Sequence, residues 1–250
     1  MPEDPAVDEL TADVRSDIAE MWFGRAASEL DVGAQFGLLA AGFSSAPSSR
    51  IQVALTEAAG DESRHSEICA AVGTRYAGAP RALSRRPLQS LVRFGSTTES
   101  TSLLLHLVLL SCVNETTSTF YLRECMKRCR ARTAHAALRD LLADDVQHAR
   151  IGWKHLGSDA VNEDDRRHVS LAMPTLLHLS HEVWSSVPER SEPWFPEHGC
   201  LGRDTATRAF VSAVREVILP GLAFVGVDAQ PASRWAEDNL ASWHSWHSTE

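Results

Sequence analysis

The chain has 250 residues, a formal net charge of -9 at pH 7 and five cysteines. This length suffices for one enlarged domain with a substantial core, and the acidic charge argues against nucleic-acid or anionic-membrane surfaces, which need a concentrated basic patch. The first twenty residues lack the apolar stretch of a signal peptide, and the richest apolar run, Leu103 to Leu110, is too short to span a bilayer. We therefore expect a cytoplasmic protein that binds neither nucleic acid nor membrane. The odd number of cysteines and the absence of a C-x-x-C pair predict free thiols.

Apolar residues recur at helical spacing along most of the chain, and strand signals are nearly absent. Capping residues, prolines and glycines divide this pattern into predicted helices over residues 11–43, 49–76, 96–130, 133–156, 162–186, 204–220 and 231–246. Ser96 and Glu99 form a capping box, Pro174 predicts a kink or a break, and Pro220 ends the sixth helix. Residues 77–95 form a connection long enough to cross a bundle, and residues 188–202 are predicted to be a loop.

These elements predict an all-α fold. We expect a four-helix bundle over residues 11–157 with a long crossover connection, followed by a helical extension over residues 158–250 that packs on the bundle.

One pattern of acidic residues and histidines occurs twice along the predicted bundle. A lone carboxylate on one helix precedes a carboxylate and a histidine, spaced i and i+3, on the next; the six residues are Glu29, Glu62, His65, Glu115, Asp145 and His148. The i and i+3 positions share a helix face, so each motif offers two ligands to one point, and the lone carboxylate can complete or bridge each metal. With 33 acidic residues and 11 histidines, chance alone gives about 1.5 such motifs, and a third, Asp165 to His168, is set aside.

The pattern indicates a metal site because each of the four carboxylates lies in the middle of an apolar stripe, the face that a helix turns toward the core. An ionised carboxylate in a low-dielectric interior must be paired, protonated or bound to a metal, and no lysine or arginine occupies these stripes. Two divalent cations would balance four carboxylates with neutral histidines. Oxygen ligands with one imidazole per metal favour two iron ions, with manganese or a mixed iron and manganese pair as alternatives.

Two further acids, Asp61 and Asp144, each lie four residues before a ligand histidine. A carboxylate beside a metal site commonly accepts the second N–H of a ligating imidazole and fixes its tautomer. We predict this role for both residues, and an ordinary solvated helix acid is the alternative for each.

The segment Asp61-Glu62-Ser63-Arg64-His65 resembles the D-E-x-R-H signature of the ferritin-like di-iron carboxylate superfamily. The chain is similar to a bacterial ferritin-like domain family of largely unassigned function, most clearly over residues 20–157. Further matching residues are Glu29 with Phe36, Glu115-Thr116, Asp144 to His148 followed by Ala149, Arg150 and Trp153, and His198-Gly199.

The resemblance implies a ferritin-like bundle whose metal ligands are the six residues of the repeated pattern. The chain departs from the residue pattern of these families at two positions. Asp145 stands where the superfamily usually has Glu, and Leu30 stands where the narrower family often has His. The shorter Asp145 leaves partial occupancy or a mononuclear site as alternatives.

Two positions bear on the type of chemistry. Thr119, one turn after Glu115, is similar to the active-site threonine of bacterial multicomponent monooxygenases; the alternative, which we favour, is a threonine that bonds back to its own helix backbone. Cys69 stands where ribonucleotide reductase small subunits carry a radical tyrosine, so we expect no stored tyrosyl radical.

We therefore expect a non-haem di-iron oxidase or oxygenase that uses dioxygen to hydroxylate, desaturate or N-oxygenate a small organic substrate. The chain holds no flavin or iron-sulfur motif, so a separate electron-donor protein is expected. Iron storage or peroxide detoxification, as in ferritins and rubrerythrins, and a non-catalytic bundle are the alternatives. The oligomeric state, for which a homodimer is one candidate, stays open.

Overall fold

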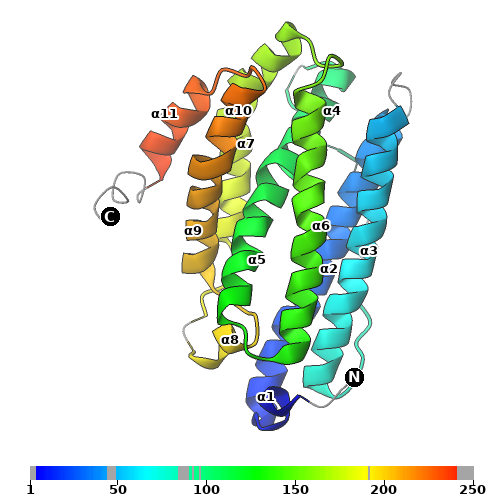
Figure 1. Ribbon diagram of the computed structural model, residues 1–250, viewed down its shortest axis with the longest axis vertical. Coiled ribbons are helices and arrows are strands. Elements are labelled where there is room, and N and C mark those ends of the chain that lie inside the picture. Colours follow the sequence, from blue (N-terminus) through cyan, green and yellow to red (C-terminus); the bar gives the residue numbers. More distant parts are fainter. Residues whose placement is uncertain are drawn as a thin grey trace. The chain divides into compact units, whose positions relative to one another are not determined.

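The computed structural model describes residues 4–43, 49–83, 90–91, 93–95, 97–190 and 192–240. Within these ranges every regular element is a helix and none is a strand, so the all-α prediction is confirmed (Figure 1). The elements are α1 (Pro5–Asp8), α2 (Ala12–Gly42), α3 (Ser49–Ala77), α4 (Glu99–Leu107), η2 (Val108–Glu115), α5 (Thr116–Arg128), α6 (Arg132–Leu156), α7 (Glu163–Ser185), α8 (Trp194–Glu197), α9 (Arg203–Ala213), η3 (Val214–Ile218), α10 (Leu219–Phe224) and α11 (Gln230–Asn239). The two segments η2 and η3 are π-helical.

The chain forms two compact units, each built from three stretches of sequence. The first unit comprises Met1–Leu91, Leu122–Asp144 and Glu189–Gly202, and the second comprises Val92–Tyr121, Asp145–Pro188 and Arg203–Glu250. Helices α5 and α6 therefore contribute residues to both units. The division at residue 157 and the four-helix bundle stay predictions.

Helices α2 and α3 lie side by side in the first unit (Figure 1). Their contact is close because a glycine faces the partner helix at two levels. A Cβ at Gly33 would lie 3.0 Å from the Cβ of Glu62, and a Cβ at Gly73 would lie 3.0 Å from the ring of Phe23. The Ser66 hydroxyl donates to the carbonyl of Ala26 at 2.7 Å, a buried bond that fixes the register.

Gly33→Ala is expected to destabilise the protein and to displace Glu62, because the added methyl meets a buried neighbour at the limit of contact. Overpacking of this kind costs about 1 to 3 kcal/mol, partly offset by the better helix propensity of alanine. Gly37→Ala is the matched control on α2: a Cβ at Gly37 meets nothing within 4 Å. It should stabilise the protein by about 0.5 to 1 kcal/mol. Urea unfolding of both variants checks the prediction, which fails if the two substitutions have the same sign.

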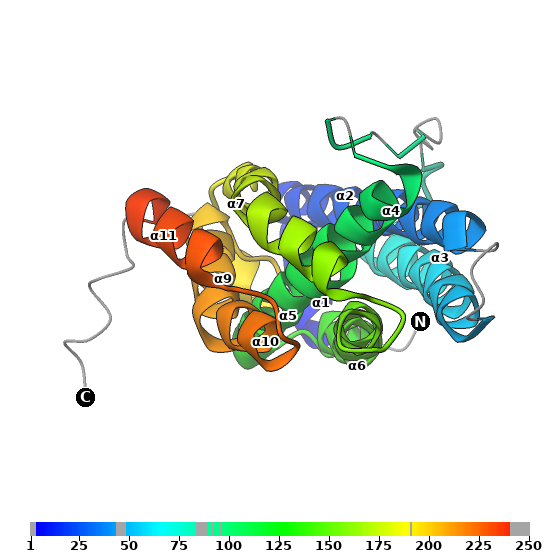
Figure 2. The same cartoon turned by 90° about the horizontal axis from the view of Figure 1, so that it is seen from above.

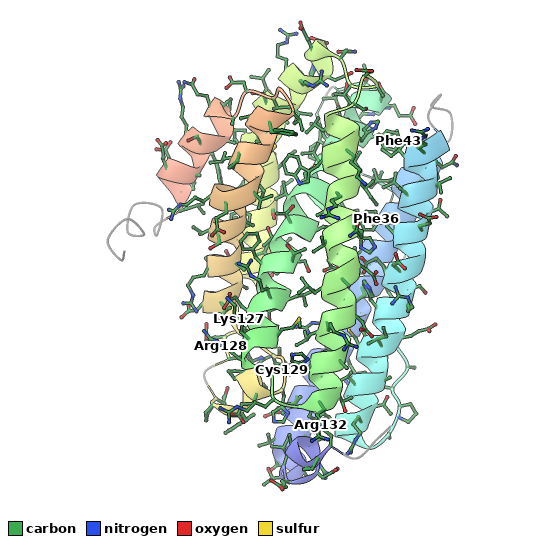
Figure 3. The ribbon with its side chains drawn as sticks, in the orientation of Figure 1. Phe36, Phe43, Lys127, Arg128, Cys129 and Arg132 are labelled. Atoms are coloured by element: carbon green, nitrogen blue, oxygen red, sulfur yellow. The ribbon has the colours of Figure 1, made fainter. Side chains whose placement is uncertain are left out.

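Hydrogen bonds join the segment Glu189–Gly202 to the other two stretches of the first unit. The Trp22 indole donates to the carbonyl of His198 at 3.2 Å, and the Tyr76 hydroxyl bonds His198 Nδ1 at 2.8 Å. The chain turns from α5 to α6 around Cys129 (Figure 3), where the backbone N–H groups of Arg130 and Ala131 donate to the carbonyl of Glu197. This segment was predicted to be a loop, but it contains the short helix α8.

His198 makes the stability of the protein depend on pH. Its side chain is buried, and burial lowers the pKa of the imidazole below its ordinary value. The unfolded chain therefore takes up a proton at a pH where the folded protein does not. The free energy of unfolding should be largest above a pH of about 6.5 and should fall as the pH drops below it. Urea unfolding at pH 8 and pH 5 should show this loss, and His198→Asn should reduce it; an equal loss in the variant would contradict the assignment.

Helices α4, η2 and α5 follow one another without a gap. Within the second unit, hydrogen bonds connect η2 to α7 and to α6. Ser180 of α7 donates to the side chain of Asn114 at 2.6 Å. The Ser111 hydroxyl donates to the carbonyl of His148 and accepts from the backbone N–H of Gly152 at 2.8 Å, which anchors η2 to α6. Helix α7 also packs against α9 and α11, as Figure 2 shows from above.

One stretch of the described chain, Glu99–Arg128, is long and apolar enough to cross a bilayer by length and composition alone. The apolar run at residues 103–110 did not indicate this, because the helix extends well beyond it on the C-terminal side. Two-thirds of the most apolar window is buried within the structure, 67%. Such burial is also found in core helices.

Several predicted boundaries need correction. Helix α7 continues through Pro174 without a break, because the proline removes only one backbone hydrogen bond while its neighbours Met173 and Leu176 are fully buried. Pro220 does not end a helix: α9, η3 and α10 follow one another without a gap, and the π-helical segment η3 lies directly before the turn that contains the proline. Helix α4 begins at Glu99 with Thr98 as its cap, and Ser96 lies outside the described residues, as does the predicted helix end at residue 246.

Candidate metal centre

The first ligand set consists of Glu29 on α2 and Glu62 and His65 on α3. Each residue offers one ligand atom, and these atoms lie within 4.8 Å of one another. Glu62 and His65 are 1% and 0% exposed, and Glu29 is partly buried. The close packing at Gly33 brings the two helices together at this level. The first unit therefore gathers two carboxylates and one imidazole at a single point.

A hydrogen-bond network supports His65 on the side away from the set. His65 Nε2 lies 3.0 Å from Asp144 Oδ2, and Arg64 donates to Asp144 at 2.7 Å and to Asp61 at 2.9 Å. Partial burial alone would raise the pKa of Asp144, but the hydrogen bonds from Arg64 and His65 outweigh it and hold the pKa below its ordinary value. An ionised Asp144 places the imidazole proton on Nε2, so the Nδ1 lone pair faces the carboxylates, as metal binding requires.

This network agrees only in part with the expectation that Asp61 and Asp144 each support a histidine. Asp144 has that geometry, but its partner His65 lies on α3 rather than one turn further along α6. Asp61 accepts from Arg64, which links the two acids. Asp61 and Asp144 could be identified as candidates from the sequence. The pairing of Asp144 with a histidine on another helix depends on the tertiary fold, so the sequence did not predict it.

The second ligand set consists of Glu115 at the end of η2 and Asp145 and His148 on α6. Their ligand atoms also lie within 4.8 Å of one another. All three are buried, with exposed fractions of 5%, 5% and 2%. A π-helical turn is uncommon and frequently marks a functional site, and here it ends at a ligand candidate.

Two hydroxyl residues follow Glu115, and the structure distinguishes them. Thr119 donates to the carbonyl of Thr116 in its own helix at 2.7 Å, which is the alternative favoured from the sequence. Ser118 donates to Asp145 Oδ2 at 2.7 Å. Sequence reasoning missed Ser118, because both Ser118 at i+3 and Thr119 at i+4 lie on the helix face of Glu115 and spacing alone does not distinguish them.

The residues set aside in the sequence behave as expected. Asp165 and Asn162 form a capping box at the start of α7, and His168 bonds the backbone carbonyl of Asp164, so this third motif is part of a helix start.

None of the five cysteines forms a disulfide, which confirms the prediction of free thiols. Burial raises the pKa of the Cys112 thiol, so it stays protonated.

The donor chemistry of both sets fits a metal ion. Each set offers two carboxylates and one imidazole, hence two negative charges when the histidine is neutral. Ionised carboxylates at this degree of burial cost several kcal/mol unless a counter-charge compensates them, and one divalent cation per set does so. Hard oxygen donors with one imidazole suit iron and manganese. Buried carboxylate and histidine clusters that could hold metal are therefore a feature of this protein.

No protein-family description matches the chain, and no curated protein matches it.

Proposed function

We propose that the protein is a non-haem di-iron oxidoreductase of the ferritin-like class. In this proposal each ligand set holds one iron ion, and the iron uses dioxygen to oxidise a small organic substrate. The observation that carries the proposal is the composition of the two ligand sets, each with two carboxylates and one histidine, of which all but the partly buried Glu29 are buried. Four-helix di-iron proteins use this same combination of two lone carboxylates and two carboxylate-x-x-histidine motifs.

The residues of the chain have separable tasks in this proposal. The carboxylates neutralise the metal charge, and Asp144 orients His65. Five of the six ligand residues are buried, which limits the access of bulk water to the two sets. Two ferrous ions, when bound, supply the electrons that reduce dioxygen. Their re-reduction between turnovers calls for a separate electron donor, and the compartment we propose is the cytoplasm.

Oxygen consumption tests the proposal against its alternatives. The protein, loaded anaerobically with ferrous iron, should consume dioxygen repeatedly in the presence of a chemical reductant, and His65→Ala should abolish the repeated turnover. Growth of a ferric mineral in a large cage would indicate storage instead. Iron binding without any oxygen uptake would indicate a bundle that has no oxidase activity, and would contradict the proposal.

A further inference from the structure

The carboxylate of Asp145 is already engaged on one side. Its Oδ2 accepts a hydrogen bond of 2.7 Å from the hydroxyl of Ser118, an ordinary length for an O–H···O bond. Both residues belong to the second unit, and Asp145 is 5% exposed. The bond therefore joins a buried carboxylate to a partly buried hydroxyl.

The contact bears on how Asp145 can bind a metal. An aspartate is one methylene shorter than a glutamate, so its two oxygens have less freedom to turn between partners. An oxygen that holds a hydroxyl proton is a poorer metal donor than the other oxygen of the same carboxylate. With Oδ2 accepting from Ser118, Oδ1 becomes the stronger donor for a metal ion in the second ligand set.

The position of Ser118 makes this contact reproducible in the fold. Ser118 lies three residues after Glu115, so both side chains project from the same face of one helix. The neighbouring Thr119 bonds its own backbone and takes no part. One helix thus supplies both a ligand, Glu115, and the group that orients a second ligand, Asp145.

We propose that Ser118 is a positioning residue that fixes Asp145 as a one-oxygen ligand of the ion in the second ligand set. The inference rests on the proposed metal centre and adds a residue and a binding mode to it. A carboxylate that binds through one oxygen occupies one coordination position instead of two. Binding through one oxygen would leave an ion in the second set a coordination position for an external ligand such as a small anion.

Anaerobic titration with Co²⁺, whose ligand-field absorption reports coordination number, tests this proposal. His65→Ala disables the first set, so the remaining ion reports on the second set alone. Loss of an orienting contact to a ligand typically weakens metal binding by about 10- to 100-fold. In the His65→Ala background, Ser118→Ala should weaken Co²⁺ binding by about 10-fold and change the absorption. Ser118→Thr, which keeps the hydroxyl, should restore both, and Thr119→Ala should change neither.

Azide supplies a second measurement, since it binds an open coordination position and alters the Co²⁺ spectrum. Azide should bind the His65→Ala protein, and Ser118→Ala should weaken azide binding, because the released carboxylate can then bind through both oxygens. Normal Co²⁺ affinity and an unchanged spectrum in Ser118→Ala would overturn the role of Ser118 while leaving the metal centre intact. Absence of Co²⁺ binding by the unsubstituted protein would instead contradict the proposed centre, and the role of Ser118 with it.

Discussion

Glu62→Gln is expected to raise the melting temperature of the metal-free protein and, at the same time, to remove most of the stabilisation that ferrous iron provides. Glu62 is 1% exposed and its carboxylate lies within 4.8 Å of the ligand atoms of Glu29 and His65. Without metal, acidic groups at this spacing repel one another and lose hydration. A neutral amide of the same shape relieves both costs, by about 1 to 3 kcal/mol.

With ferrous iron bound, Glu62→Gln should instead lower the melting temperature relative to the unsubstituted protein. An ion that binds only the folded state stabilises it by about 4 kcal/mol at a free concentration 1,000 times the dissociation constant. Glu62→Gln removes a ligand, so the variant should bind at least one ion fewer and gain little from added iron. Thermal unfolding with and without ferrous iron checks both signs. Glu67→Gln, at an exposed position on α3, is the control and should behave like the unsubstituted protein. A lower melting temperature of metal-free Glu62→Gln would contradict the account.

Asp144→Asn is expected to weaken the binding of one iron ion by about 10- to 100-fold without removing a ligand. Asp144 Oδ2 lies 3.0 Å from His65 Nε2 and 2.7 Å from the Arg64 guanidinium, so the ionised carboxylate determines which imidazole nitrogen carries the proton. An amide of equal size cannot hold the proton on Nε2 in the same way. The Nδ1 lone pair is then less available to the first ligand set.

Isothermal titration under anaerobic conditions checks this prediction. Asp140→Asn is the matched control: Asp140 lies one turn earlier on α6 and pairs with its neighbour Arg139 at 3.2 Å. The control should bind both ions with unchanged affinity. Equal affinities for Asp144→Asn and Asp140→Asn would show that the contact with His65 has no role in metal binding.

The bounds of α3 and α6 and the ligand candidates were predictable because local signals and burial agree there. The predicted helix over residues 49–76 compares with Ser49–Ala77 in the structure, and the predicted helix over residues 133–156 compares with Arg132–Leu156. The ligand candidates could be found because a carboxylate in the middle of an apolar stripe conflicts with its surroundings. Glu62, Glu115 and Asp145 are indeed all buried.

The features that escaped prediction depend on tertiary contacts or on departures from the α-helical period. A π-helical turn holds more residues than an α-helical turn, so η2 interrupts the 3.6-residue spacing on which the stripe around Glu115 was based. Ser118, and not Thr119, contacts Asp145. Both residues lie about one turn after Glu115, so spacing along the helix does not determine which of them makes this contact. The link between Asp144 and His65 joins residues 79 positions apart in the chain.

The central claim is that the two ligand sets together hold two metal ions. The most direct measurement is anomalous scattering from crystals grown after anaerobic loading with ferrous iron. We expect two iron peaks, one bound by Glu29, Glu62 and His65 and the other by Glu115, Asp145 and His148. Crystals that bind iron elsewhere and show no peak at either set would contradict the claim.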